Sequence, residues 1–517
     1  MECFVIFVMA WCWYNATESK PQNVSKHTEM KILQTIIILF ITISSFAQSN
    51  YDDSKISNKT KKAVKKIEKV NELMSSAVYS SGMRPKQWDN FETLKETATE
   101  SELIELTNHP NGVVRSYSFW ALSYNKNVDL FKILKNHLND DELISTQFGC
   151  IGGQEKVGDF YIQVLTPQYV DLDSKKLNKQ QFRELDSLLV YSNNNLNAKY
   201  GAIQRIESSE SNYGKIKELY LEKNDQSALV KLAKYNKVED IELILNNREK
   251  DNSEEGGYFH TYKAISNFPN SEFFPFLKSQ LQKTLDNTHY SNEWTQLYRA
   301  IASYKNEDAK NQLLIPFTQV EHKNIRKYHL NMIFSALNEF QSHNYDELLW
   351  KLWEEENKIS PKVFEYLSSL NSSKAFELTK KSMQNPNELD IANFSFDNFE
   401  ETKSLNEQML DLIINKDRDF GFQLIRENIK KSNVHNFPLY ATKASEIKDK
   451  SFVKPLIEIL ETEWNAHIYL SATKALISYD NQDINKQILN ARTKNENLRK
   501  EWGGKAFDKL LAENGIE

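Results

Sequence analysis

The sequence predicts an all-α protein: a right-handed α-solenoid of repeated helical hairpins, preceded by a cleavable apolar leader. Three observations support this fold class. Glycine and proline, which interrupt helices, number only 14 and 11 in 517 residues, about 5% against a usual share of about 12%. A helix–corner–helix pattern occupies residues 103–122, and an aromatic–polar junction recurs along the chain. An apolar run that ends in small residues lies near the N-terminus.

Residues 30–47 have the pattern of a secretory signal peptide. Lys31 precedes an apolar run from Ile32 to Phe46, and Ser45-Phe46-Ala47 is a small-x-small cleavage site. We therefore expect cleavage between Ala47 and Gln48.

Residues 1–29, which contain Cys3 and Cys12, are interpreted as an over-extended start or a non-structural leader. The alternative is that the apolar runs are retained as a membrane anchor, but both are shorter than the roughly 18 residues of a spanning helix. The protein is predicted to be exported, either periplasmic or secreted, with no stable membrane span after cleavage. Only Cys150 then remains, which excludes an internal disulfide.

Residues 48–92 are predicted to form an N-terminal capping helix and its join to the repeats. The stretch from Lys59 to Lys69 is basic, and Val64, Ile67, Val70 and Met74 share one helical face. A solvated capping helix is favoured over a basic membrane-surface helix.

The organising stretch follows, from Thr107 to Leu138. A short apolar cluster ends at Asn108 and at Pro110-Asn111-Gly112, because proline lacks an N–H and Asn and Gly accept turn dihedrals. Val114, Tyr117, Ser118, Ala121 and Leu122 then fall on one face of a second helix.

This stretch resembles a HEAT repeat at Asn108, Pro110, Val114, Arg115, Ala121 and Leu122. The resemblance implies helical hairpins stacked into a solenoid, with Arg115 bridging neighbouring repeats through polar contacts. Tyr117, Phe119 and Trp120 stand where the family has small residues, which suggests wider spacing between helices.

A junction of one aromatic residue, an Asn or Asp and an apolar pair recurs after the second helix. It occurs at Tyr124, Tyr235, Phe268, Tyr304 and Tyr479, with 33 residues from Tyr235 to Phe268 and 36 from Phe268 to Tyr304. Helical-hairpin repeats have periods of roughly 33–47 residues. We predict that the aromatic fills the seam between repeats and that the Asn or Asp caps the next helix.

The repeats are predicted to form a HEAT-like solenoid over 93–384 and to resume over 405–517, where they end in a C-terminal cap. Between them, residues 385–404 lose helical phase and are interpreted as an irregular hinge or an atypical repeat.

Residues that could carry chemistry are few, and each has a structural interpretation. Cys150 has no nearby histidine to act as a base and aligns with the small-residue second helix of a repeat, so a buried structural thiol is expected. His260 is expected to be packed or capping. Trp350 and Trp353 are assigned to the core, with Glu354 and its acidic neighbours facing water. No catalytic, cofactor or metal residue is predicted, and the usual catalytic and phosphate-binding motifs do not occur.

The predicted function is non-catalytic binding in the cell envelope, because stacked repeats present long surfaces to large partners. A protein partner is favoured. Binding of a glycan or peptidoglycan through exposed aromatics is the alternative, and a hydrolase with a site dispersed in sequence is a third hypothesis. A net charge of −6 does not favour nucleic acid.

Overall fold

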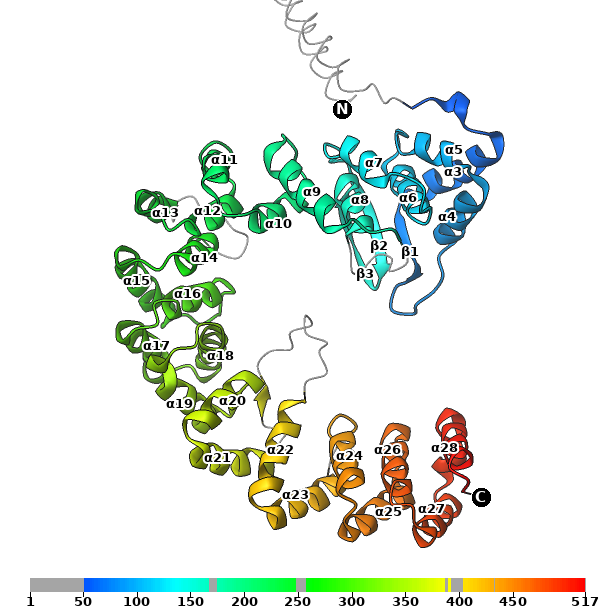
Figure 1. Ribbon diagram of the computed structural model, residues 1–517, viewed down its shortest axis with the longest axis vertical. Helices are drawn as coiled ribbons and strands as arrows, with labels where there is room; N and C mark the ends of the chain where they lie inside the picture. Colours follow the sequence, from blue (N-terminus) through cyan, green and yellow to red (C-terminus); the bar gives the residue numbers. More distant parts are fainter. Residues whose placement is uncertain are drawn as a thin grey trace, which may run out of the picture. The chain divides into compact units, whose positions relative to one another are not determined.

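The computed structural model describes residues 51–166, 174–247, 257–385, 389–391, 403–431 and 433–516. The predicted leader, with its cleavage site at Ala47 and Gln48, lies outside the described residues, as does most of 385–404. The described chain is mostly helical, in agreement with the all-α prediction at that level. It divides into two compact units, the first ending at Glu207 and the second beginning at Ser208 (Figure 1).

The first unit combines helices with a small sheet. Its elements in chain order are η1 (Asp53–Lys55), α3 (Asn58–Val70), β1 (Leu73–Val78), α4 (Lys86–Thr97), α5 (Glu100–Leu106), α6 (Gly112–Ser123), α7 (Leu130–Asn136), β2 (Leu143–Gly149), β3 (Ile151–Lys156), α8 (Val157–Leu165), α9 (Lys179–Tyr191) and α10 (Ala198–Arg205).

The predicted capping helix is α3, although the expected apolar face is wrong at its C-terminal end. Val64 and Ile67 are buried, but the helix ends at Val70, which is exposed, and Asn71 takes a left-handed φ of 53°. Met74 consequently lies on β1 instead of on the helix.

Helix α6 is the centre of the first unit, and every one of its residues is buried. Phe91 of α4 stacks on Tyr117 and on Trp120 at ring distances of 4.9 and 5.2 Å, and Tyr161 of α8 stacks on Phe119 at 3.8 Å. A helix that is apolar all round needs neighbours on every side. Tyr117, Phe119 and Trp120 are therefore the residues through which α6 packs on α4 and α8.

A three-stranded sheet covers another side of α6 and corrects the prediction of helices only. Its order is β1-β2-β3, with β1 parallel to β2 and β2 antiparallel to β3. The Tyr117 hydroxyl accepts from the backbone N–H of Met74 at 2.7 Å and donates to the Met74 carbonyl at 2.9 Å, which joins α6 to β1.

The expectation that Cys150 lies on a buried helix is also wrong, because residues 143–156 form the β2–β3 hairpin. Gly149 has a φ of 56° and Cys150 does not have a positive φ, as a two-residue type II′ turn requires. The Cys150 thiol is exposed at this turn.

In its described residues, the second unit is helical apart from one short strand pair. Its elements in chain order are α11 (Glu210–Lys223), α12 (Gln226–Ala233), η2 (Val238–Asp240), α13 (Ile241–Asn247), α14 (Phe259–Asn267), η3 (Ser271–Phe273), α15 (Phe274–Thr284), α16 (Glu293–Ala302), α17 (Glu307–Gln319), α18 (Lys323–Glu339), η4 (His343–Tyr345), α19 (Asp346–Glu356), β4 (Lys358–Ile359), α20 (Pro361–Leu370), α21 (Ser372–Gln384), β5 (Asp390–Ile391), α22 (Leu405–Lys416), α23 (Arg418–Lys431), α24 (Phe437–Ile447), η6 (Lys450–Phe452), α25 (Val453–Thr462), α26 (Ala466–Ile477), α27 (Gln482–Lys494), η7 (Glu496–Arg499) and α28 (Glu501–Glu513). Within the predicted hinge, the described pair of residues on β5 is parallel to β4.

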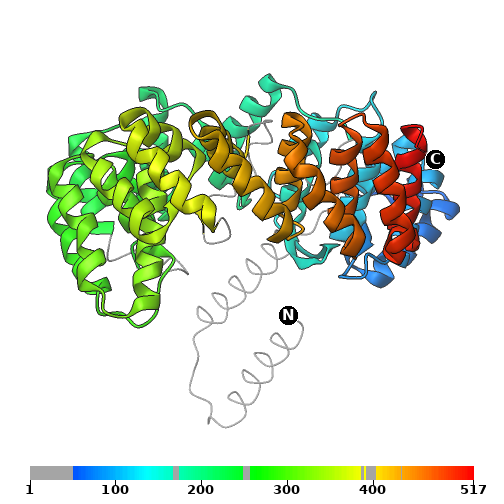
Figure 2. The ribbon, with the colours of Figure 1, turned by 90° about the horizontal axis from the view of Figure 1, so that it is seen from below.

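Runs of even-numbered helices in the second unit pack against one another in sequence, from α12 to α18 and from α24 to α28. Helix α14 lies between α12 and α16, and α16 in turn contacts α18. Helices α24, α26 and α28 pack in the same way, as Figure 2 shows in orange to red. Odd-numbered helices form a second layer, in which α25 contacts both α23 and α27.

Three of the five recurring junctions share one backbone conformation. After the aromatic residue, Asn236, Lys305 and Asp480 each take a left-handed φ of about 50°, with values of 54°, 52° and 49°. This conformation ends the even-numbered helix. The following Asn306 and Asn481 side chains accept hydrogen bonds from the first turns of α17 and α27. The predicted capping role of these asparagines is confirmed.

Candidate interaction surface

Arg115, the residue matched to the HEAT arginine, is buried and makes five hydrogen bonds. Its Nε and Nη2 donate to the two carboxylate oxygens of Asp140 at 2.8 Å each, and Nη2 also donates to Glu142 at 2.5 Å. Its Nη1 donates to the backbone carbonyls of His109 and Pro110 at 2.7 and 3.0 Å. Arg115 thus ties the α5–α6 corner to the segment that enters β2.

Electrostatics around Arg115 favour a fixed structural ion pair. Burial by itself raises the pKa of Asp140, but hydrogen bonds from His137 and Arg115 outweigh it, so this pKa lies below its ordinary value. Burial, reinforced by the Arg115 charge, lowers the pKa of His109 to about 4. His109 is therefore neutral at pH 7 and accepts at Nδ1 from the backbone N–H of Asn111.

The remaining HEAT-like positions lie at this corner and along α6. Val114, Ala121 and Leu122 are buried on α6, whereas Pro110 is exposed in the turn. The residue that caps α6 is Asn111, whose side chain accepts from the Val114 N–H at 3.0 Å. Asn108 instead closes the preceding turn, with its N–H donating to the Glu105 carbonyl at 3.0 Å.

Two of the junction aromatics bridge successive helical pairs. The Tyr304 hydroxyl, after α16, donates to the carbonyl of Asn270, after α14, at 2.5 Å. The Tyr479 hydroxyl, after α26, donates to the carbonyl of Asp449, after α24, at 2.9 Å. Tyr345, which the sequence pattern missed, donates in the same way to the Ala302 carbonyl at 2.9 Å.

The other three junction aromatics make ring contacts. Tyr235 lies edge-on to Tyr213 at 5.2 Å, and Phe268 lies edge-on to Phe273 at 6.0 Å. The ammonium group of Lys95 lies 4.8 Å from the Tyr124 ring centre.

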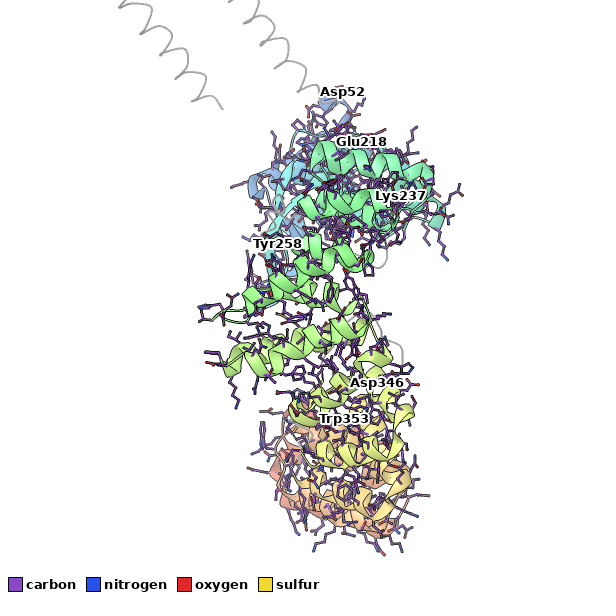
Figure 3. The ribbon with its side chains drawn as sticks, turned by 90° about the vertical axis from the view of Figure 1, so that its left-hand side faces the viewer. Asp52, Glu218, Lys237, Tyr258, Asp346 and Trp353 are labelled. Atoms are coloured by element: carbon purple, nitrogen blue, oxygen red, sulfur yellow. The ribbon has the colours of Figure 1, made fainter. Side chains whose placement is uncertain are left out.

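Trp353 and His260 have the packed positions expected of them. Trp353, on α19 (Figure 3), is buried and donates through Nε1 to Ser382 at 3.1 Å. Trp350 stacks on Trp353 and is half-buried beneath the Lys374 ammonium group. His260 is half-buried and edge-on to Phe259.

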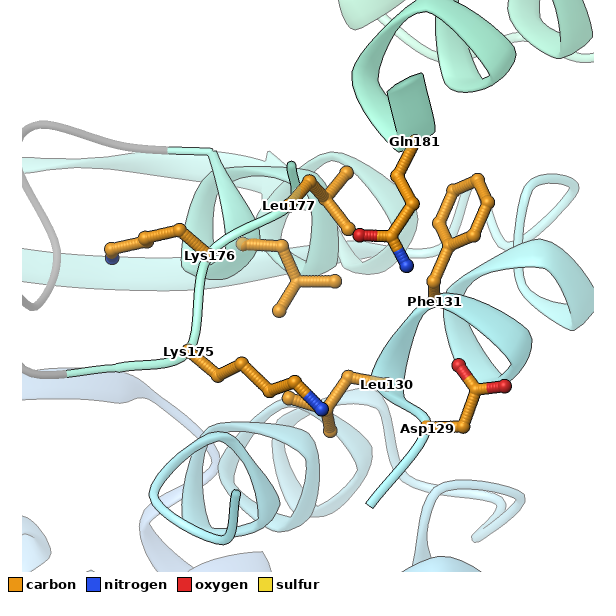
Figure 4. Close-up of a pocket in the computed structure, with 8 residues that line it drawn as sticks. Asp129, Leu130, Phe131, Lys175, Lys176, Leu177 and Gln181 are labelled. Carbon is orange, nitrogen blue, oxygen red and sulfur yellow. The ribbon is translucent and has the colours of Figure 1, made fainter. Parts of the chain in front are cut away.

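A small cavity in the first unit does not have the size of a ligand site. It encloses about 210 Å³, open solvent included, and is lined by Asp129, Leu130, Phe131, Leu165, Lys175, Lys176, Leu177 and Gln181 (Figure 4). Binding pockets usually enclose about 300–1,000 Å³. The Lys175 ammonium that crosses this cavity donates to the carbonyls of Val128 and Lys126, so its hydrogen bonds serve the fold.

The strongest candidate for partner contact is a cluster of exposed rings that the sequence analysis did not single out. Trp464 and Trp502 are 76% and 55% exposed, and the His467 ring, also exposed, lies 5.2 Å from that of Trp502. We call Trp464, His467 and Trp502 the aromatic patch. It lies at the N-terminal ends of the neighbouring helices α26 and α28.

Close packing of α26 and α28 brings the His467 and Trp502 rings together. A Cβ atom at Gly503 would lie 2.7 Å from Cβ of Ala466 and 2.0 Å from the Tyr469 hydroxyl, so only glycine permits this approach. Because Gly503 follows Trp502 directly, the contact places Trp502 beside the first turn of α26.

The loop that carries Trp464 is held by polar side chains. The Glu463 carboxylate accepts from the backbone N–H groups of Trp464 and Asn465 at 2.9 and 2.7 Å. The buried Asn495 amide donates to the carbonyls of Leu460 and Glu463 at 2.8 and 2.9 Å. The exposed Trp464 side chain therefore projects from a well-braced backbone.

A second exposed pair has a comparable position. Tyr290 precedes α16, Tyr328 lies in the second turn of α18, and their rings stack at 4.2 Å with 21° between the planes. Both side chains are exposed. Exposed aromatics thus occur twice at the N-terminal ends of neighbouring even-numbered helices.

Comparison with known proteins adds no homologue. The chain matches no family model, and neither a curated protein nor a solved structure is significantly similar to it. Within the described ranges, no group of three or more His, Cys, Asp or Glu side chains could hold a metal ion. None of the helices in that part of the chain has the length and apolarity needed to cross a membrane.

Proposed function

We propose that this chain is a non-catalytic interaction protein of the cell envelope, built as a right-handed HEAT-like α-solenoid that holds a partner protein. The HEAT-like corner at Asn108–Arg115 and the sequential packing of even-numbered helices support the solenoid. Export is supported by the signal-peptide pattern over 30–47.

The observation that carries the binding proposal is the aromatic patch. A tryptophan that is 76% exposed leaves a large apolar ring in water, and Trp464 does so three residues before His467, whose ring contacts that of the exposed Trp502. Trp and Tyr are the residues that most often dominate the binding energy of protein interfaces. The braced loop reduces the conformational entropy that Trp464 loses when a partner binds.

Glycan binding is the second candidate function, and the same geometry favours it. Flat, solvent-facing rings such as those of Trp464 and Trp502 present an apolar face with a polar edge. A sugar ring could stack there without a deep pocket. The two candidates differ in what the patch retains, so one set of variants can separate them.

The test compares wild-type protein with the double variant Trp464→Ala/Trp502→Ala. Each protein is immobilised and exposed to envelope extract and to a panel of envelope glycans, and the retained material is quantified by mass spectrometry. If the patch binds a protein, wild type should retain one protein in near-stoichiometric amount, and the double variant should retain at least tenfold less of it. The same protein, once purified, should bind wild type again.

Leu221→Ala is the matched control, because Leu221 is another exposed apolar residue of the second unit, on α11. It should retain the same partner as wild type. Retention of a glycan alone, again lost in the double variant, would support the second candidate. Equal retention by the double variant and wild type would rule out the patch as the binding surface.

A further inference from the structure

The open edge of the sheet in the first unit is a second surface with unused hydrogen-bonding groups. In the order β1-β2-β3, strand β3 has a partner on one side only among the residues that the structure describes. It is seen as the outer strand in Figure 1. Residues 151–154 (Ile-Gly-Gly-Gln) are exposed, and Ile151 is 74% exposed.

The register of the hairpin determines which backbone groups point outward. Leu143 is opposite Lys156, and the Val157 N–H donates to the Glu142 carbonyl at 3.1 Å. This bond makes the 143–156 pair a non-hydrogen-bonded one, and such pairs alternate with hydrogen-bonded pairs along an antiparallel ladder. The N–H and C=O groups of Gly152 and Gln154 therefore point away from β2.

These outward groups have no other partner in the described chain. Neither Gly152 nor Gln154 makes a backbone or side-chain hydrogen bond outside the sheet to any residue in the described ranges. Natural edge strands are usually protected by a lysine, a proline, a bulge or a covering loop. The lysine of β3, Lys156, lies at its end and is held by hydrogen bonds to the Asn195 carbonyl and the Asn197 side chain. Residues 151–154 have no lysine, proline or bulge, and they are exposed to solvent among the residues that the structure describes.

We infer that β3 is a docking edge for an extended peptide segment of a partner protein, which adds as a fourth strand. The outward groups of Gly152 and Gln154 would give and accept its backbone hydrogen bonds. On the face shared by Ile151 and Gly153, the absence of a side chain at Gly153 leaves room for a bulky apolar residue of the peptide. The fitting partner segment is thus extended, with alternate apolar residues.

A second copy of this chain fits the edge less well than a peptide does. Six residues of strand extend about 20 Å, and pairing over that length covers far less than the roughly 800 Å² per partner of a stable interface. A free peptide can instead follow the edge and place side chains on both faces of the sheet.

The test measures binding of a fluorescein-labelled peptide with three Thr-Ile repeats between terminal lysines, by fluorescence polarisation with the full chain. Gln154→Pro removes one outward N–H and places a ring at the edge, while the bonds to β2 are kept. Gln154→Ala keeps that N–H and is the matched control. We expect Gln154→Pro to weaken binding at least tenfold and Gln154→Ala to bind as wild type does.

Two further measurements guard against misfolding of the proline variant. A peptide N-methylated at alternate residues lacks the donors that reach β3, and it should bind wild-type protein at least tenfold more weakly. Hydrogen exchange should slow at Gly152 and Gln154 when the unmodified peptide is added. Equal binding of both peptides, unchanged exchange, or no binding at millimolar peptide would overturn the inference. Dimerisation of wild type that Gln154→Pro abolishes would also overturn it, in favour of a second copy.

Discussion

Replacing Arg115 by alanine tests how much of the first unit depends on one buried ion pair. The side chains of Arg115 and Asp140 are only 10% and 13% exposed. The substitution removes five hydrogen bonds and leaves the Asp140 carboxylate buried without its bidentate partner. Breaking a buried pair in this way costs about 3–5 kcal/mol. Domains are typically stable by about 5–15 kcal/mol, so the first unit should lose a large part of its stability.

Arg492→Ala is the matched control, because Arg492 also forms a bidentate pair with an aspartate, Asp508, at 2.8 and 3.0 Å. Those side chains are 36% and 50% exposed, and an exposed pair contributes less than about 1 kcal/mol. Urea unfolding measures the loss of stability caused by each substitution. Hydrogen exchange then shows whether the loss for Arg115→Ala lies in the first unit. If Arg115→Ala lowers the free energy of unfolding no more than Arg492→Ala does, the buried ion pair of Arg115 does not stabilise the first unit as inferred.

Three further substitutions test other parts of the fold. Burial lowers the pKa of His329 to about 4. The imidazole therefore binds a proton more readily in the unfolded chain than in the folded one, so the free energy of unfolding of the second unit should decrease as the pH falls. The decrease should reach up to about 3 kcal/mol between pH values of about 6.5 and 4. His329→Gln should remove that dependence from hydrogen exchange in α16 and α18. Gly503→Ala should lower the stability measured by thermal unfolding by about 1–3 kcal/mol, because the added methyl group overpacks against α26. Lys505→Ala, on the exposed side of α28, is the control and should change the stability by less than about 0.5 kcal/mol. Gly149→Ala should cost about 1 kcal/mol, because alanine disfavours the left-handed φ of the turn, and should speed exchange in β2 and β3.

Features that depend on near neighbours in the chain could be predicted from the sequence. The turn between α5 and α6 follows from Pro110 and Gly112, and capping of α17 and α27 follows from Asn306 and Asn481. Helical phase located α3, but not the point where it ends, because the left-handed turn at Asn71 decides that locally.

The sheet was missed because its strands are weak in isolation. Strand β1 pairs with β2 about 70 residues later, so no local pattern marks the partner. A signal for the β2–β3 hairpin was nonetheless present. Gly149 at the first position of a two-residue turn, between Phe148 and Ile151, is typical of a type II′ hairpin. The interpretation of Cys150 as a helical residue overrode that signal.

The candidate surfaces were also beyond sequence reasoning. Trp464 and Trp502 are of a residue type that is usually buried, and nothing in their local sequence marks them as exposed. The position of Trp502 beside α26 depends on the approach of α28 to α26 at Gly503, which is a contact between separate helices.

The sequence by itself determined the helical class of this chain, the recurring junction and the asparagine caps, because each depends on residues within a few positions of one another. Tertiary structure decided what surrounds α6, where the Cys150 thiol lies, and which aromatics remain in water. Those outcomes depend on contacts between distant segments: Tyr117 with β1, Arg115 with Asp140, and Gly503 with α26. The free energy of such contacts comes from burial and hydrogen bonding between elements, and the local pattern of each element does not specify its partner.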